Sequence, residues 1–181
     1  MDREIKSNID RSQEFLKKKD FNNAELILIK NLKISNDNFE TFFLLGAISG
    51  IKKNYEKAEI YLKKAKDLNS SHVNSILNLA IIQKKMNKKI DSINNFKKVI
   101  ELDKGNLEGL CGLAQIFEED ENFTLAETYF KKVLKIEPNH HVANHGYGKL
   151  LLKLDQHNQG LKLIKKVSGI IRFQKDKIQI I

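Results

Sequence analysis

Residues 107–140, LEGLCGLAQIFEEDENFTLAETYFKKVLKIEPNH, decide the fold of this chain. Their apolar side chains recur three and four places apart, as on one face of a helix, and the polar pair Glu121-Asn122 divides the stretch into two helical halves. The pattern returns when the frame is moved by its own length in either direction. Successive frames begin at Ile5, Phe39, Val73, Leu107 and His141.

Two places in the frame are always small and one is always large. The eighth place holds Ser12, Gly46, Ala80, Ala114 and Gly148. The twentieth place holds Ala24, Ala58, Ser92, Ala126 and Gly160. The twenty-fourth place holds Leu28, Leu62, Phe96, Phe130 and Ile164. Small residues let two helices approach closely and large residues fill the space beside them, so the columns predict stacked pairs of antiparallel helices.

These columns resemble the tetratricopeptide repeat family, a resemblance that covers nearly the whole chain. It is strongest in the frame from Leu107, at Leu110, Leu113-Ala114, Phe117, Phe123, Ala126, Phe130, Val133 and Pro138. The resemblance implies an all-α, right-handed α-solenoid of about five repeats, or ten helices. A generic helical bundle is the alternative, but a bundle has no reason to repeat its sequence pattern at a fixed period.

The frame also sets the expected domain organisation. We expect an array over residues 1–172 and a capping or pairing tail over 173–181. The repeats are expected at 5–38, 39–72, 73–106, 107–140 and 141–172. In the first repeat Asn8 and Arg11 stand at places that are normally apolar, which suits a terminal helix with one face in water.

Polar residues between the frames predict where each new helix is capped. Candidate caps lie at 36–37, 70–71, 105–106 and 138–139, since Asn, Ser and Asp side chains accept hydrogen bonds from the first free N–H groups of a helix.

The charge balance is less informative about polyanion binding than its size suggests. The formal net charge is +9, yet 29 of the 32 cationic residues are lysines. Arginine, not lysine, is the residue that binds phosphates through paired hydrogen bonds of its guanidinium group. The frame 107–140 is acidic and interrupts any basic track. We therefore disfavour nucleic acid as a partner. The opening residues lack a secretory signal and no apolar run is long enough to cross a bilayer, so we expect a cytoplasmic protein that does not span a membrane.

No catalytic, metal or cofactor motif stands out. The lone Cys111 excludes an internal disulfide framework, and His141 and His145 share a helix face without a third ligand at helical spacing. His140 and His141 stand where a helix begins, which favours a capping or solvated role. The acidic run 118–121 lacks the alternation of a calcium loop and is typical of a solvated turn. We expect no enzyme activity, no cofactor and no metal.

The resemblance places the binding surface on the first helix of each pair, at the second, fifth, sixth, ninth and twelfth places of the frame. The expected groove residues are Phe43, Ala47, Asn74, Leu77, Asn78, Ile81, Lys84, Glu108, Gln115, His145 and Lys149. An apolar floor with a few amide and charged groups suits a peptide or helix of a partner protein. The expected function is thus a non-catalytic scaffold for protein–protein interaction. The alternatives are a regulatory or substrate-presenting subunit of an enzyme system and, less favoured, a polyanion binder.

The tail is expected to cover the last repeat. Residues Ile170, Ile171, Phe173, Ile178, Ile180 and Ile181 are apolar, and 178–180 alternate as an extended segment does. The tail is too short for a stable free helix. We expect it to fold back on the last helix or to form a homodimer contact with a second chain.

Overall fold

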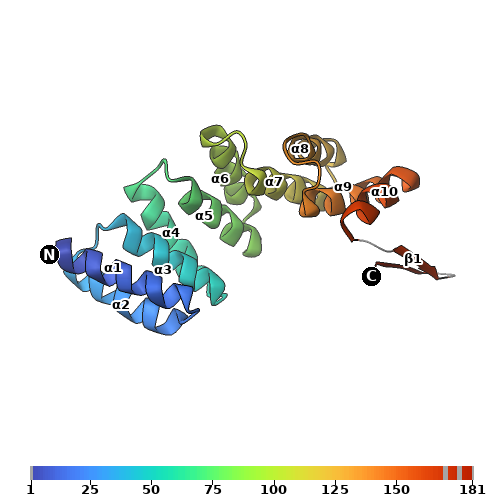
Figure 1. Ribbon diagram of the computed structural model, residues 1–181. Helices are drawn as coiled ribbons and strands as arrows, with labels where there is room; N and C mark the ends of the chain where they lie inside the picture. Colours follow the sequence, from blue (N-terminus) through green and yellow to red (C-terminus); the bar gives the residue numbers. More distant parts are fainter. Residues whose placement is uncertain (1, 169–170, 175–176, 181) are drawn as a thin grey trace. The chain divides into compact units, whose positions relative to one another are not determined.

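The computed structural model describes residues 2–168, 171–174 and 177–180, and in these it forms ten helices and two short strands (Figure 1). The helices are α1 (Asp2–Lys17), α2 (Phe21–Ile34), α3 (Phe39–Ile51), α4 (Tyr55–Leu68), α5 (Val73–Lys85), α6 (Lys89–Leu102), α7 (Leu107–Glu119), α8 (Phe123–Ile136), α9 (His141–Lys153) and α10 (His157–Ser168). The strands are β1 (Ile171–Gln174) and β2 (Lys177–Ile180).

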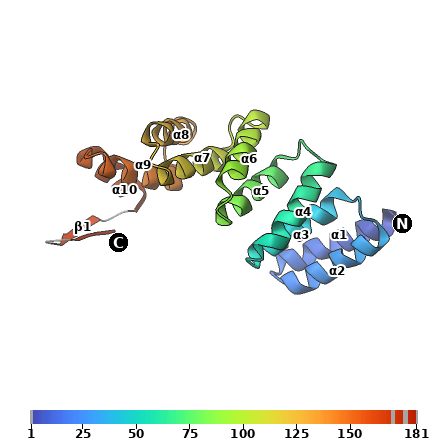
Figure 2. The same cartoon turned by 180° about the vertical axis from the view of Figure 1, so that it is seen from behind.

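The chain divides into two compact units, residues 1–98 and 99–181, each built from helices that pack in chain order. In the first unit each of α1 to α4 contacts the next helix, and α3 also contacts α5. In the second unit α7 contacts α8, α8 contacts α9, α9 contacts α10, and α7 also contacts α9. The neighbouring helices α1 to α4 lie side by side in both Figure 1 and Figure 2. This packing confirms the predicted all-α fold of consecutive helix pairs.

The small columns lie where paired helices are in tight contact. A Cβ added at Gly46 of α3 would lie 2.6 Å from Cγ of Leu62 in α4. In the second unit, a Cβ added at Gly148 of α9 would lie 2.9 Å from the carbonyl oxygen of Gly160 in α10. The eighth and twentieth places are therefore small because a larger side chain would push the two helices apart.

Four helices begin with a side-chain cap on the residue just before the frame start. Asn38 accepts a hydrogen bond from the N–H of Thr41, and Asn106 accepts one from Gly109. His72 and His140 use the ring nitrogen Nδ1 in the same way.

The observed caps differ from most of the predicted cap positions, and they confirm the capping role of His140. The expected caps at 36–37, 70–71 and 138–139 were wrong by one or two residues, and only the pair 105–106 contains the observed cap. A capping atom reaches the free N–H groups only from the residue that directly precedes the first helical turn. The capping role expected at 140–141 is confirmed for His140, whose Nδ1 lies 3.2 Å from the backbone nitrogen of Ala143.

The turn inside each helix pair uses a left-handed residue that is not glycine. Lys19, Lys53, Asn87, Glu121 and Asp155, which all stand at the fifteenth place of their frames, have φ between 57° and 60°. The N–H of the following residue bonds to a carbonyl five residues back, as Asn54 does to Ser49 at 2.9 Å. This is the Schellman ending, in which glycine is normally favoured because a Cβ is strained at positive φ.

Replacing Lys53 and Glu121 with glycine is expected to stabilise the chain. Each substitution removes left-handed strain of about 1 kcal/mol, part of which is lost again to the greater freedom of glycine in the unfolded state. We expect a net gain of about 0.5 kcal/mol per site, measured by thermal unfolding followed by circular dichroism. Asn87→Gly is the control and should gain less, since asparagine tolerates this conformation. Loss of stability at both sites would contradict the account of the turn.

A buried polar network in the first unit corrects the prediction for Asn8. This residue was expected on a water-facing helix, but it is 8% exposed and its Nδ2 donates to Oδ1 of Asn31 at 2.8 Å. Asn31 is fully buried and donates in turn to the carbonyl of Ile5 and to Oγ1 of Thr41. Asn8 is polar because Asn31 needs a partner inside the unit. The expectation holds for Arg11, which is exposed.

The tail forms an antiparallel hairpin in its described residues. Strand β1 pairs with β2, and the register sets Ile171 opposite Ile180 and Phe173 opposite Ile178. The extended conformation expected for 178–180 is thus observed. Helix α10 ends at Ser168 and β1 begins at Ile171, so residues 171–172 belong to the hairpin and not to a helix of the last repeat. Ile170 and Ile181 lie outside the described residues.

The helices carry no membrane span: within the described residues, none is both long enough and apolar enough to cross a bilayer.

Candidate functional site

A largely apolar cavity of about 370 Å³ opens in the first unit where α3, α4 and α5 meet. Its lining residues are Gly46, Ala47, Gly50, Ile51, Tyr55, Leu62, Asn78, Ile81, Ile82 and Lys85. The α3 side is kept open by its two glycines and its alanine, where longer side chains would fill the space. Gly50 is a tight point of this wall, since a Cβ there would lie 3.1 Å from Cδ1 of Ile82.

Two isoleucines give the cavity an exposed apolar rim. Ile51, the last residue of α3, is 56% exposed, and Ile81 of α5 is 38% exposed. The floor beneath them is formed by Leu62 and Ile82, which are buried. The exposed isoleucines lie above a buried apolar floor. Covering this surface with another apolar group would lower the free energy of the system.

The polar groups of the cavity have no partners within the described part of the chain. No hydrogen bond or ion pair engages the side-chain amide of Asn78 or the ammonium of exposed Lys85. An amide supplies both donors and an acceptor, and an ammonium supplies three donors and a positive charge. An apolar cavity with one free amide and one free cation can bind a group that is apolar in the middle and polar or acidic beside it.

Three of the expected groove residues line this cavity: Ala47, Asn78 and Ile81. The prediction missed Ile51 and Lys85, which both stand at the thirteenth place of their frames. That place follows the ninth, held by Ala47 and Ile81, by one helical turn. Extending the predicted face by four residues would have found both.

The other expected residues of the first unit lie outside the cavity lining. The ring of Phe43 is half-buried and belongs to a cluster of three rings, in which it stacks on Phe39 at 6.1 Å and meets His72 edge-on at 4.9 Å. Leu77 is 9% exposed and belongs to the packed interior. Asn74 is exposed, and Lys84 is half-buried.

In the second unit the expected groove residues make a more polar surface. Glu108 and Lys149 are exposed, while Gln115 and His145 are half-buried. Burial, with Lys149 and His141 nearby, lowers the pKa of His145 below its ordinary value. Its Nδ1 is buried and has no hydrogen-bond partner in the described residues.

The family model described as tetratricopeptide repeat matches residues 39–72 and 107–140. These two segments of the chain are tetratricopeptide repeats. The two matched segments coincide with the second and fourth frames, and the helix pairs α3–α4 and α7–α8 lie within them.

A sequence relative and several solved structures resemble this chain. Tetratricopeptide repeat protein 8 of Mus musculus is 33% identical over 86 residues, which are 48% of this chain and 16% of that protein. The chain therefore spans only about a sixth of that relative. Among solved structures, MamA from Desulfovibrio magneticus RS-1 matches with a TM-score of 0.83 and 15% identity, over 91% of this chain and 93% of that one.

YrrB, a tetratricopeptide repeat protein with an unusual peptide-binding site, matches with a TM-score of 0.75 and 15% identity, over 88% of this chain and 82% of that one. At such low identity, these structural matches establish a shared fold.

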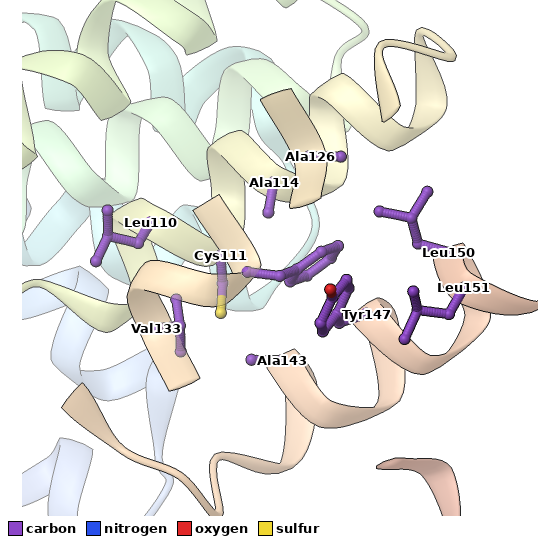
Figure 3. Close-up of a cluster of buried hydrophobic side chains, with 10 residues drawn as sticks. Leu110, Cys111, Ala114, Ala126, Val133, Ala143, Tyr147, Leu150 and Leu151 are labelled. Carbon is purple, nitrogen blue, oxygen red and sulfur yellow. The ribbon is translucent and has the colours of Figure 1, made fainter. Parts of the chain in front are cut away.

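Cysteine is the most nucleophilic type of side chain in this sequence, and the structure places Cys111 inside the core. Figure 3 shows it within a cluster of buried side chains from α7, α8 and α9. Burial, with added repulsion from Glu108 and Glu137, raises the pKa of the thiol to about 11. The nearest histidine is the capping residue His140, whose Nδ1 lies 3.9 Å from Sγ. That nitrogen already accepts from Ala143, and a thiol with a raised pKa is a poor nucleophile.

We expect Cys111 to resist alkylation at neutral pH. Iodoacetamide labelling at pH 8, followed by intact-mass spectrometry, should be far slower in the folded chain than in the same chain in urea. The folded-state rate should climb as the pH approaches about 11, because thiolate is the reacting form. Fast labelling of the folded chain at pH 8 would show an activated thiol and would reopen the question of catalysis.

The two metal candidates do not gather enough ligands. His141 and His145 stack with ring centroids 6.5 Å apart. In the acidic run, Glu118 pairs with Lys153 at 2.8 Å, and Glu121 occupies the left-handed turn position. Within the described residues, no group of three or more His, Cys, Asp or Glu side chains is placed to hold a metal ion.

Proposed function

We propose that this chain is a non-catalytic interaction module that holds a segment of a partner protein in the cavity between α3 and α5. The observation that carries the proposal is the cavity itself. It has an apolar floor, an exposed isoleucine rim and a free amide and ammonium at its edge. Apolar pockets with a few polar groups are typical of binding sites for peptides.

Two further observations support this function. The fold is shared with YrrB, a tetratricopeptide repeat protein with a peptide-binding site. The best candidate nucleophile, Cys111, is buried with a raised pKa. In the second unit, we propose a more polar contact surface at Glu108, Gln115, His145 and Lys149.

The test fills the cavity without disturbing the helices. Ala47→Leu adds three carbons to a half-buried helical position on the cavity wall, and leucine is nearly as good a helix former as alanine. Ile60→Ser is the matched control, because Ile60 of α4 is 65% exposed and does not line the cavity. Both variants should keep the helical circular-dichroism spectrum of the natural chain.

Affinity capture followed by mass spectrometry gives the readout. Proteins retained by the natural chain and by Ile60→Ser should be lost from Ala47→Leu. If Ala47→Leu retains the same proteins at the same level, the cavity is not the binding site. Recovery of nucleic acid with a steep dependence on salt would instead support the polyanion alternative.

A further inference from the structure

We infer that the segment held by this cavity is extended and carries one branched aliphatic or aromatic side chain beside acidic residues. This inference rests on the proposed function and adds the chemistry of the partner. Three features of the first unit carry it: the free amide of Asn78, the pattern of charge around the cavity, and the size of its apolar floor.

The free amide favours an extended segment over a helix. Asn78 lines the cavity and its side chain has no partner within the described part of the chain. A helix satisfies its own backbone N–H and C=O groups, so it offers none of them to a side-chain amide. An extended segment leaves these groups free, and one peptide unit can both donate to and accept from Asn78. The exposed backbone of the segment is thus what the amide recognises.

The charge pattern favours acidic neighbours. From Thr41 to Ile51 in α3 and from Val73 to Gln83 in α5, the sequence has no charged residue. The charges that follow at the two helix ends are all lysines: Lys52, Lys53, Lys84 and Lys85.

Only some of these lysines are already engaged. Lys52 pairs with Glu25 at 2.6 Å, and Lys84 also has an interaction inside the chain. Lys85 is the one charged side chain among the described residues that line the cavity, and it has no ion-pair partner there. A carboxylate in the bound segment, next to the side chain that enters the cavity, would form an ion pair with the ammonium of Lys85.

The wider charge distribution points the same way. Residues 1–98 contain 20 Lys and Arg against 12 Asp and Glu, a net charge of +8, while residues 99–181 carry only +1. The unit that contains the cavity therefore holds nearly all of the excess positive charge. An acidic segment is attracted to this unit before contact, and a basic one is repelled.

The cavity volume favours a single anchoring side chain. About 370 Å³ accommodates one leucine-sized or phenylalanine-sized group together with its peptide unit. The glycines and alanine of α3 leave this space, and Ile51 and Ile81 close over its sides. The apolar anchor enters the cavity, the backbone pairs with Asn78, and a flanking carboxylate meets Lys85.

The experiment titrates three synthetic peptides into the full chain labelled at the isoleucine δ1 methyl groups. The first peptide has one leucine between pairs of aspartates in a Gly/Ser sequence. The second has serine in place of the leucine, and the third has lysines in place of the aspartates. Nuclear magnetic resonance follows the methyl signals of Ile51, Ile81 and Ile82. The method detects weak binding, with dissociation constants up to the millimolar range.

The first peptide should shift all three cavity methyl signals to saturation, while the signal of the exposed Ile90 methyl group does not change. The serine and lysine peptides should each bind at least about tenfold more weakly. Lys85→Glu should weaken the aspartate peptide by about tenfold and strengthen the lysine peptide, a reversal that a merely damaged fold would not produce. Asn78→Leu should weaken the aspartate peptide without reversing the charge preference.

Several outcomes would overturn the inference. Equal binding of the lysine peptide removes the acidic preference, and equal binding of the serine peptide removes the apolar anchor. Absence of any shift with the aspartate peptide overturns the inference as a whole. The proposed function would survive each of these results if Ala47→Leu still loses the captured partners, so the two failures are distinguishable.

Discussion

Gly148→Ala is expected to destabilise the chain by about 2 kcal/mol, although alanine is the better helix former. The new Cβ would lie 2.6 Å from Cγ1 of Ile164 and 2.9 Å from the backbone oxygen of Gly160. A flexible side chain could move aside, but a backbone carbonyl inside a packed helix pair moves only if α9 and α10 separate. Overpacking of this kind costs about 1–3 kcal/mol, and it outweighs the roughly 1 kcal/mol gained in helix propensity.

Thermal unfolding measures the effect. A loss of about 2 kcal/mol corresponds to a fall in Tm of roughly 4–8 °C for a chain of this size. Gly105→Ala is the control, since its Cβ would make only an ordinary contact of 3.6 Å with Oδ1 of Asp103. This control should stay within about 0.5 kcal/mol of the natural chain. A stabilised Gly148→Ala variant would show that the helix pair is not closely packed at the eighth place.

Asn31→Leu is expected to cost about 3 kcal/mol, because it leaves buried polar groups without partners. The Nδ2 group of Asn8 loses its acceptor, and the carbonyl of Ile5 and the hydroxyl of Thr41 lose a donor. An unsatisfied buried polar group costs about 1–3 kcal/mol, and here more than one is affected. The measurement is urea unfolding followed by circular dichroism.

A double-mutant cycle separates the network from a simple loss of shape. The double variant Asn8→Ala/Asn31→Leu should lose less free energy of unfolding than the two single variants together. Asn8→Ala leaves Oδ1 of Asn31 without a donor, and Asn31→Leu removes that oxygen altogether. Asn94→Leu, on an exposed face of α6, is the control and should stay within about 0.5 kcal/mol. Additive costs would indicate that Asn8 and Asn31 do not form a shared network.

The sequence predicts the helix pairs well because their physics is local and repeated. The frame starts Phe39, Val73, Leu107 and His141 are the first residues of α3, α5, α7 and α9. One constraint, the close approach of two helices, selects small residues at the same two places of each repeat. The period therefore carries the information on where the inner helices begin.

Three features could not be predicted, because each depends on neighbours in space. The capping position depends on which residue directly precedes the first turn, and histidine is an uncommon cap. The burial of Asn8 depends on its partner Asn31, 23 residues away. The cavity itself depends on how α3, α4 and α5 meet, although its lining residues Ile51 and Lys85 lie only one helical turn beyond the face expected from the family.

Site-specific photo-cross-linking tests the central claim most directly. A photoreactive amino acid placed at position 81 in the cavity is compared with the same group at position 60, which is the more exposed site at 65% against 38%. If the cavity holds the partner, cross-links to partner protein will concentrate at position 81 despite its lower exposure, and Ala47→Leu will abolish them. Equal or greater cross-linking at position 60, unchanged by Ala47→Leu, would contradict the account.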